Sequence, residues 1–269
     1  MTNPANKTVL ITGAGGGFGR HMVHRFRAAG AKLILTDISD RALREGIDDA
    51  GDSLVASVVA DLATEEGCDA VVESCASRGV VPDILVNNAG IAVAGRLDHI
   101  PRDRWEMLMQ LNLLAPMRLC NAFLPGMIER GSGHVVNMSS LAGWVGSHGL
   151  SAYCASKFGL RGFGESLATD LKGTGIHVTN VYPCFSQTAI LDSPQYGYEQ
   201  KRAVPQYLIS EPSVVVARII KGVRHNRLHV FPDKYARRIH YVTRFVPWLI
   251  PVLDRRMQTD SIEAGREAG

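Results

Sequence analysis

A tyrosine and a lysine, Tyr153 and Lys157, stand four residues apart in SAYCASKFGLRGFGESLATDLKGTG, a segment of helical length. Side chains four apart project from the same face of a helix. A phenol with an ordinary pKa of about 10 is a poor base at neutral pH, so proton transfer by Tyr153 needs a pKa about 3 units lower. Nearby positive charge must then stabilise the phenolate by roughly 4 kcal/mol. The pair predicts acid–base chemistry; the alternative is an ordinary pair on a helix surface.

A glycine-rich turn lies near the start of the chain. The sequence TGAGGGFG at 12–19 ends the strand-like segment KTVLIT and opens a helical segment. Gly13, Gly17 and Gly19 let the backbone turn tightly and approach a pyrophosphate, and the N-terminus of the helix offers free N–H groups to that anion. Because the turn joins the first strand to the first helix, it predicts a dinucleotide site.

An acidic residue ends the second predicted strand. Asp37, in LILTDIS, follows Gly19 at the distance typical of a dinucleotide site. Its carboxylate can accept hydrogen bonds from the adenosine ribose and would repel a 2′-phosphate. The glycine turn also carries no Lys or Arg at its variable positions, so we expect NAD in preference to NADP. The alternative makes Asp37 the N-cap of the next helix.

Short apolar strands alternate with helical segments along the whole chain. Several strands are nearly continuous apolar runs, which is typical of strands covered on both faces. The alternation predicts an α/β fold with a doubly wound parallel sheet. Region 183–212, rich in Pro, Gly, Ser and Tyr, suits a mobile loop over a site. The strands are expected at 7–12, 32–36, 53–59, 83–88, 133–139, 176–182 and 227–231.

The sequence resembles the short-chain dehydrogenase/reductase family in four motifs: TGAGGGFG, NNAG at 87–90, SSLAGWVGSHGLSAYCASK at 139–157 and YPCFSQT at 182–188. The resemblance covers about residues 7–232. It implies a Rossmann-type sheet of about seven parallel strands, with cofactor and catalytic sites in one domain, residues 1–232, followed by a C-terminal helical extension, residues 233–269. It also implies a homodimer or homotetramer, with the helix that carries Tyr153 and Lys157 between subunits.

The resemblance assigns a catalytic set of Asn112, in LNLLAP, with Ser140, Tyr153 and Lys157. Tyr153 is the general acid/base, and an oxidised nicotinamide adds its positive charge to that of Lys157. Lys157 also binds the nicotinamide ribose. Ser140 hydrogen-bonds the substrate oxygen, and Asn112 positions a water through which the proton leaves. Hydride passes between the substrate carbon and the nicotinamide. The alternative for Ser140 is a residue that merely ends a strand.

Further cofactor contacts follow from the same motifs. Asp61 and Leu62 match the place where the family contacts adenine, with a simple turn as the alternative, and Thr188 matches the residue that holds the nicotinamide carboxamide. Cys184 stands where the family usually has Gly, and we expect it to narrow the pocket or alter the loop, with an inert thiol favoured over a redox sensor. No metal site is predicted. The predicted cofactor-binding residues are Gly13, Gly17, Phe18, Gly19, Asp37, Asp61, Leu62, Asn88, Ala89, Gly90, Tyr153, Lys157, Pro183 and Thr188.

The composition is that of a globular protein with one large core: 269 residues, 46% hydrophobic and 20% charged. A formal charge of +3 is too small to indicate nucleic-acid binding, but ten Lys/Arg against two Asp within 218–256 make that segment strongly basic. The five cysteines are odd in number and lack ligand spacing, so we expect reduced thiols. Without a visible secretory signal or a run of about 20 apolar residues, we expect a cytoplasmic protein with no spanning helix.

Apolar residues are frequent in the segments around the predicted site. The loop at 186–212 is expected to close over the substrate and exclude water. Only Arg96 and His148 are candidates to face a substrate carboxylate, so we expect a small lipophilic partner, a secondary alcohol or ketone. The predicted apolar lining comprises Ile91, Val93, Leu141, Trp144, Val145, Leu150, Ala189, Ile190, Leu191, Tyr196, Tyr198, Val204, Tyr207 and Leu208.

The C-terminal segment RRIHYVTRFVPWLIPVLDRR at 237–256 departs from the rest of the chain. From Lys234 to Val246, apolar positions recur at three- and four-residue steps with basic residues on the other faces, which predicts an amphipathic helix. Pro247 is expected to end it, leaving WLIPVLDRR as a short apolar knob. Residues 234–256 could contact an anionic membrane surface, with Trp248 and Tyr241 at the headgroup level, or pack on the core or on a second subunit.

The favoured function is an NAD(H)-dependent oxidoreductase that interconverts a lipophilic secondary alcohol and its ketone. One alternative is a dinucleotide-sensing or scaffold protein with weak catalysis, against which the intact Asn112, Ser140, Tyr153 and Lys157 set argues. The others are a reductase of small polar carbonyl compounds and an isomerase or dehydratase built on the same fold.

Overall fold

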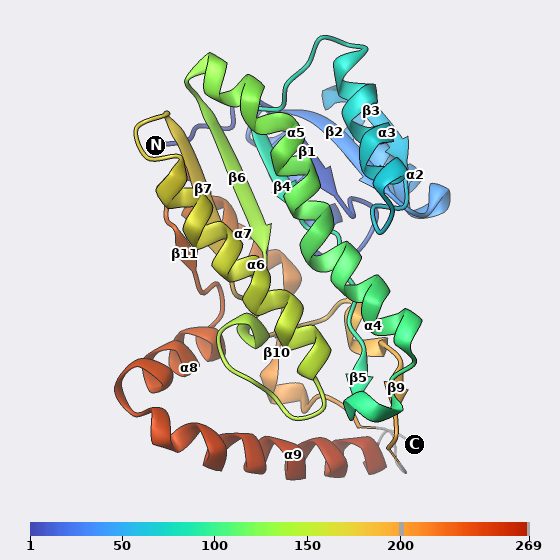
Figure 1. Ribbon diagram of the computed structural model, residues 1–269, viewed down its shortest axis with the longest axis vertical. Helices are drawn as coiled ribbons and strands as arrows, with labels where there is room; N and C mark the ends of the chain where they lie inside the picture. The colour runs from blue at the N-terminus through green and yellow to red at the C-terminus, as the bar shows by residue number, and fades with distance from the viewer. Residues whose placement is uncertain (199–201, 268–269) are drawn as a thin grey trace.

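The computed structural model describes residues 1–198 and 202–267, and its centre is a twisted parallel sheet (Figure 1). Seven strands form it in the order β3-β2-β1-β4-β6-β7-β11. The predicted α/β doubly wound Rossmann-type sheet is confirmed. Each predicted strand is present, although the last is reduced to two residues. The strands are β1 (Thr8–Thr12), β2 (Lys32–Asp37), β3 (Leu54–Val59), β4 (Ile84–Asn87), β6 (Gly133–Met138), β7 (Ile176–Val181) and β11 (His229–Val230).

Helices cover both faces of the sheet, which explains why its strands are apolar at nearly every position. Within β1, Val9 and Ile11 pack into the core cluster that includes Phe26, whereas Leu10 points the opposite way into the cluster that includes Phe123. One face carries α1 (Gly17–Ala28), α2 (Asp40–Ala50) and α7 (Pro212–Arg224), and the other carries α3 (Glu65–Ala76), α5 (Ala115–Arg130) and α6 (Ser151–Asp170).

The strand order reverses between β1 and β4, and this reversal positions the site. In a doubly wound sheet, ligands bind outside the carboxyl ends of the strands where the order reverses. The glycine turn follows β1, the NNAG turn follows β4, and Ser140 comes two residues after β6. The motifs that the sequence separates by more than a hundred residues therefore meet at one edge of the sheet.

The region 183–212, expected as a mobile loop, contains short ordered elements. Strand β8 (Phe185–Ser186) pairs with β10 (Ile209–Ser210), and β9 (Gln195–Tyr196) pairs with β5 (Ala94–Gly95). The 3₁₀ turns η5 (Ala189–Asp192) and η6 (Gln206–Leu208) lie between them. The segment is therefore tied both to itself and to the turn after β4.

The C-terminal extension begins with the predicted helix, α8 (Lys234–Phe245). The prediction of a short knob after Pro247 is wrong: a 3₁₀ turn, η7 (Pro247–Leu249), leads into an 18-residue helix, α9 (Ile250–Glu267). Pro251 falls in the first turn of α9, where a missing N–H breaks no helical hydrogen bond, so this proline starts a helix instead of interrupting one.

Both C-terminal helices lie near the carboxyl ends of the strands, at the lower edge of Figure 1. The backbone of Ala203 donates to Ser261 O at 3.2 Å, and Ser261 Oγ donates to Ala203 O at 2.9 Å, so α9 is tied to the region 183–212. Across the described parts of the chain, no helix has the length and apolar character needed to cross a membrane.

A buried histidine lies on β6, the strand that leads to Ser140. His134 is fully buried, with Nδ1 2.9 Å from Thr2 Oγ1 and Nε2 2.8 Å from Thr179 Oγ1. Burial among these neutral groups lowers the pKa of His134 to about 3. The folded protein therefore holds this imidazole neutral under mildly acidic conditions.

We expect His134 to make stability fall at low pH. An unfolded histidine binds a proton near pH 6.5, whereas folded His134 does so only near pH 3. The contribution is full above about pH 6.5 and decreases as pH falls through this window, by up to about 1.4 kcal/mol per pH unit. Urea unfolding should show a weaker pH dependence for His134→Gln than for the native chain. His225→Gln, at an exposed position, should match the native chain; an unchanged dependence in His134→Gln would contradict the assignment.

Candidate active site

Ser140, Tyr153 and Lys157 come together at the carboxyl end of β6. Ser140 has extended backbone and caps the 3₁₀ turn η4 (Leu141–Gly143), where its Oγ accepts from Ala142 N at 3.1 Å. Tyr153 and Lys157 lie one turn apart near the start of α6 and are both buried. All three side chains line one cavity, so the structure brings together these three members of the predicted catalytic set.

Lys157 Nζ donates to Met138 O at 2.9 Å and lies 5.7 Å from the centroid of the Tyr153 ring. Burial lowers the pKa of Lys157 to about 8. Burial also raises the pKa of Tyr153 to about 12, although a hydrogen bond with Ser140 opposes the rise. The protein's own groups therefore do not produce the predicted lowering of the Tyr153 pKa. Burial of the phenolate raises this pKa by more than the hydrogen bond with Ser140 lowers it.

Asn112 lies in a π-helical turn, η3 (Gln110–Leu114), between α4 (Arg102–Met109) and α5. Its Oδ1 accepts from Ile91 N at 2.9 Å, and its Nδ2 donates to Ile91 O at 2.9 Å and to Ser156 Oγ at 3.2 Å. A Cβ on Gly90 would lie 3.0 Å from Asn112 Oδ1 and 3.4 Å from Lys157 Nζ. The amide thus fastens the turn after β4 to α6, close to Lys157.

The glycine turn has the shape of an anion cradle. Gly13 and Gly17 have φ values of 62° and 47°, and a Cβ on Gly19 would overlap Gly13 O. Helix α1 begins after Gly16 without a side-chain cap, which leaves N–H groups of its first turn for an anion. The space beside Gly16 is open. These residues fit the pyrophosphate of a dinucleotide.

Gly15 belongs to the same cradle, although the sequence did not single it out. Its N–H donates to Asp37 Oδ2 at 3.0 Å, and a Cβ there would overlap the backbone of Ala42. Asp37 Oδ1 also accepts from Ser39 N at 3.1 Å. Ser39 is the residue whose side chain caps α2, so the N-cap alternative for Asp37 is wrong. The carboxylate instead lies against the glycine turn.

Thr12 is a second residue that sequence reasoning missed. Its Oγ1 accepts from Asn88 N and Ala89 N, both at 2.9 Å. Asn88 Nδ2 in return donates to Thr12 O at 2.8 Å and to Gly13 O at 3.0 Å. The NNAG motif therefore braces the glycine turn. A threonine at the end of an apolar strand gives no sign of this role, because only its partners across the sheet reveal it.

Asp61 and Leu62 lie at the turn after β3. Asp61 is exposed and its Oδ1 accepts from Ala63 N at 2.9 Å, while Leu62 is buried. These contacts are those of a turn before α3, whose N-cap is Thr64. Contact of Asp61 and Leu62 with adenine stays a prediction.

Pro183, Cys184 and Thr188 connect the edge of the sheet to the C-terminal extension. Pro183 O accepts from Leu141 N at 2.8 Å, and Cys184 N donates to Asp233 Oδ2 at 2.8 Å. A Cβ on Gly17 would lie 3.4 Å from the side chain of Thr188, so Thr188 faces the glycine turn. Burial raises the pKa of the Cys184 thiol to about 12, which supports an inert packing role over a redox sensor.

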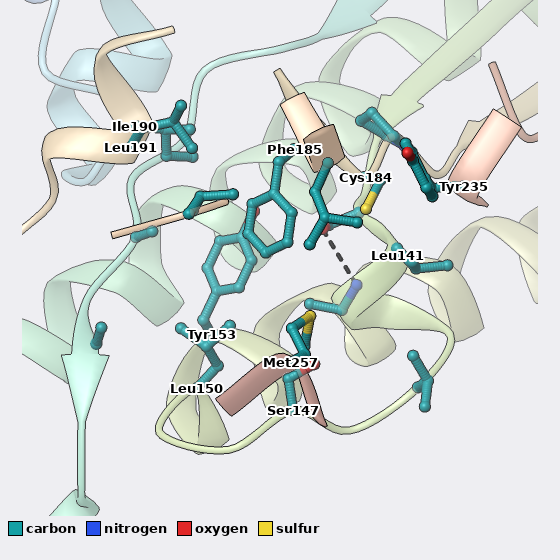
Figure 2. Close-up of a pocket in the computed structure, with 18 of the residues that line it drawn as sticks. Leu141, Ser147, Leu150, Tyr153, Cys184, Phe185, Ile190, Leu191, Tyr235 and Met257 are labelled. Carbon is teal, nitrogen blue, oxygen red and sulfur yellow. Dashed lines mark hydrogen bonds between the residues drawn. The ribbon is translucent and has the colours of Figure 1, made fainter. Parts of the chain in front are cut away.

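A cavity of about 770 Å³ extends from these residues toward the C-terminal helices (Figure 2). It is also lined by Phe18, at the start of α1, and by His148. Arg96 is instead paired with Asp98 at 2.6 Å. The extension supplies a wall that the sequence left undecided: Tyr235, Ile239, Val242, Ile250, Leu253 and Met257. Of the predicted apolar lining, Leu141, Val145, Leu150, Ile190, Leu191, Tyr198, Val204, Tyr207 and Leu208 are present.

Five residues of the predicted lining lie elsewhere. Ile91, Val93 and Tyr196 belong to the apolar cluster that packs around Leu108 and Tyr153 and do not line the cavity, and Ala189 is exposed. The fifth is Trp144, whose neighbours come from distant parts of the chain.

Trp144 is outside the cavity lining and contacts α8. Its Nε1 donates to Thr243 Oγ1 at 2.9 Å, its ring meets Phe231 and His240 edge-on at 5.0 and 4.9 Å, and the Arg161 guanidinium lies 3.6 Å from its centroid. Trp144 follows Ser140 by four residues. The segment that carries Ser140 is therefore fastened to the C-terminal extension.

Comparison with known proteins agrees with this geometry. A family model described as short chain dehydrogenase matches residues 7–196. Epidermal retinol dehydrogenase 2 of Mus musculus is 34% identical over 252 residues, covering 91% of this chain and 80% of that protein. A short-chain dehydrogenase from Streptomyces avermitilis has a TM-score of 0.80 at 28% identity, covering 96% of this chain and 98% of that one. Another from Sphingobium yanoikuyae, in complex with NADPH, has a TM-score of 0.75 at 27% identity and covers 94% of each.

The chain therefore belongs to the short-chain dehydrogenase/reductase family. It is an NAD(P)-dependent oxidoreductase with the family's Rossmann-like sheet, followed in this chain by C-terminal helices.

We expect Gly143→Ala to displace Ser140 from Tyr153. The added methyl group would overlap Ser139 Oγ and lie 2.5 Å from Lys157 O, so it would push η4 away from α6. A displacement of this kind should lower kcat/KM by about a hundredfold while circular dichroism stays native. Gly162→Ala is the matched control, because that glycine lies on α6 with open space beside it. Unchanged kinetics in Gly143→Ala would show that this close approach does not set the site.

Proposed function

We propose that this oxidoreductase interconverts a lipophilic secondary alcohol and its ketone with NAD(H), with Tyr153 as the general acid/base. One observation carries the proposal: Ser140, Tyr153 and Lys157 lie together in the lining of a large cavity that is otherwise mostly apolar. An apolar cavity with a few convergent polar groups favours an apolar ligand oriented by those groups. The similarity to a relative named as a retinol dehydrogenase supports the same substrate class.

The chain's own groups divide the work of proton transfer. Tyr153 takes the proton of the alcohol during oxidation and returns it during reduction, while Ser140 Oγ holds the substrate oxygen. Lys157 as a cation stabilises the phenolate and holds the nicotinamide ribose. A bound dinucleotide would supply the hydride acceptor and a second positive charge near Tyr153. Oxidation needs the phenolate and reduction needs the phenol, so raising the pH favours oxidation and disfavours reduction.

Asp37 supports NAD over NADP. Its carboxylate is held by the N–H groups of Gly15 and Ser39, at the end of β2 where the family's dinucleotide site binds the adenosine ribose. Arg20, the first basic residue after the glycine turn, lies 2.7 Å from Glu45 and 2.8 Å from Asp49. Its charge is therefore already balanced, and a 2′-phosphate would face net negative charge.

We expect Asp37→Asn to shift cofactor preference toward NADP. The amide keeps an acceptor for the glycine turn but removes the charge that repels the 2′-phosphate. The ratio of kcat/KM with NADP to that with NAD should rise by about tenfold or more, which is roughly 1.4 kcal/mol. Asp48→Asn, an exposed neutralisation on α2, should leave the ratio unchanged. A native preference for NADP would reject the assignment.

The substrate proposal is tested by NADH formation with steroids, retinoids, fatty alcohols and sugars, run in parallel with NAD and NADP. We expect turnover of the lipophilic alcohols, and Tyr153→Phe should lower kcat by about 10²- to 10⁴-fold while NADH binding, measured by fluorescence, persists. Turnover of small polyols alone would sink the proposed substrate class. Tight NADH binding without turnover of any compound would favour the sensing alternative.

The homodimer or homotetramer implied by the family also belongs to this proposal. Phe158 on α6 and Met117 on α5 are 40% and 39% exposed, which supports a contact between copies along these helices. Sedimentation velocity on the full chain is expected to give a dimer or tetramer, and a purely monomeric species would reject the contact.

A further inference from the structure

The C-terminal extension presents apolar side chains to solvent at the junction of its two helices. Trp248, Phe245 and Val252 are 68%, 64% and 63% exposed. With Tyr241, Leu249 and Leu253, which are also exposed, they form what we call the α8–α9 face. Monomeric soluble proteins rarely expose large contiguous apolar patches without a use for them.

The α8–α9 face is the outer side of the two helices, and their inner side lines the cavity and contacts the core. On α8, Ile239 and Val242 line the cavity and Thr243 is fastened to Trp144, whereas Tyr241 and Phe245 point outward and stack at 6.4 Å. The inner side of α8 is thus occupied by contacts within the fold. The outer side chains need another partner.

The surroundings of the face are strongly basic. Residues 234–256 contain six Lys/Arg and one acidic residue, Asp254. Arg237, Arg244 and Arg255 are exposed. Within residues 1–198 and 202–267, none of the three forms an ion pair with a carboxylate. Exposed aromatic and aliphatic side chains flanked by unpaired arginines are the pattern of a segment that lies at an anionic lipid interface.

A second copy of the chain fits this face less well. A two-fold symmetric contact would bring the same surface of both subunits together and would oppose the arginines of one copy to those of the other. An anionic lipid surface instead supplies the complementary charge to Arg244 and Arg255, while Trp248 and Phe245 enter the boundary between headgroups and acyl chains.

We propose that the α8–α9 face docks the protein on an anionic lipid surface. The position of the cavity gives this docking a purpose that rests on the proposed function. Leu253 belongs both to the face and to the cavity lining, and its neighbours Ile250 and Met257 also line the cavity. Docking would therefore bring the lipid next to residues of α9 that line the cavity, which shortens the route of a lipophilic alcohol to the site.

The test is co-sedimentation of the full chain with phosphatidylcholine vesicles that contain or lack phosphatidylserine. We expect binding to the anionic vesicles, reduced at least about tenfold in Phe245→Ser/Trp248→Ser, whose positions lie outside the cavity lining. Val214→Ser/Leu97→Ser, at exposed apolar positions on α7 and in the 3₁₀ turn Leu97–His99, is the matched control and should bind normally. Arg244→Glu/Arg255→Glu should abolish the preference for phosphatidylserine, whereas Lys172→Glu should not.

Two outcomes would overturn the proposal. One is negligible binding of the native chain to both kinds of vesicle. The other is conversion of a native oligomer to smaller species by Phe245→Ser/Trp248→Ser, which would assign the face to a second copy. NADH binding and activity toward a detergent-dispersed alcohol should be unchanged in this variant. Vesicle binding needs no turnover, so failure of the proposed substrate class would leave its result interpretable.

Discussion

The ammonium of Lys157 is held inside the protein at the carboxyl end of β6, where Met138 O accepts its hydrogen bond at 2.9 Å. Much of the site depends on this contact, because it requires α6 to lie directly against the end of the strand. Gly143 and Gly90 are the positions where a side chain would enter that space. Burial lowers the pKa of Lys157 and raises the pKa of Tyr153, because it disfavours the charged form of each side chain. A further positive charge close to the buried phenol would stabilise its phenolate form and so lower the pKa of Tyr153.

Most of the fold could be predicted from the sequence because its strands carry an unambiguous pattern. Strands buried on both faces leave few polar positions, and the turns between them are marked by glycine. The prediction failed at α9, where WLIPVLDRR was interpreted as a short knob although its Pro251 occupies the first turn of a helix. A proline inside a helix breaks it, whereas a proline in the first turn removes no helical hydrogen bond. Only the hydrogen bonds of the folded helix show which of the two positions a proline occupies.

The site divides in the same way. The four-residue spacing of Tyr153 and Lys157 predicted that they share one helix face, and the family resemblance added Ser140 to them. Thr12 and Gly15 act through hydrogen bonds to other parts of the chain, which no local pattern encodes. Trp144 was predicted to line the pocket but contacts Arg161 on α6 and Thr243 on α8 instead. These partners are distant in the sequence, so no local pattern could indicate them.

The carboxylate of Asp233 binds two segments of the chain at once. Its Oδ1 accepts from Ala236 N and caps α8, while its Oδ2 accepts from Cys184 N beside the cavity, both at 2.8 Å. One buried carboxylate therefore satisfies both backbone groups, and any movement of Asp233 disturbs the first turn of α8 and the chain at Cys184 together. This shared anchor couples the two segments, so binding free energy that fixes one of them in place favours the ordered state of the other.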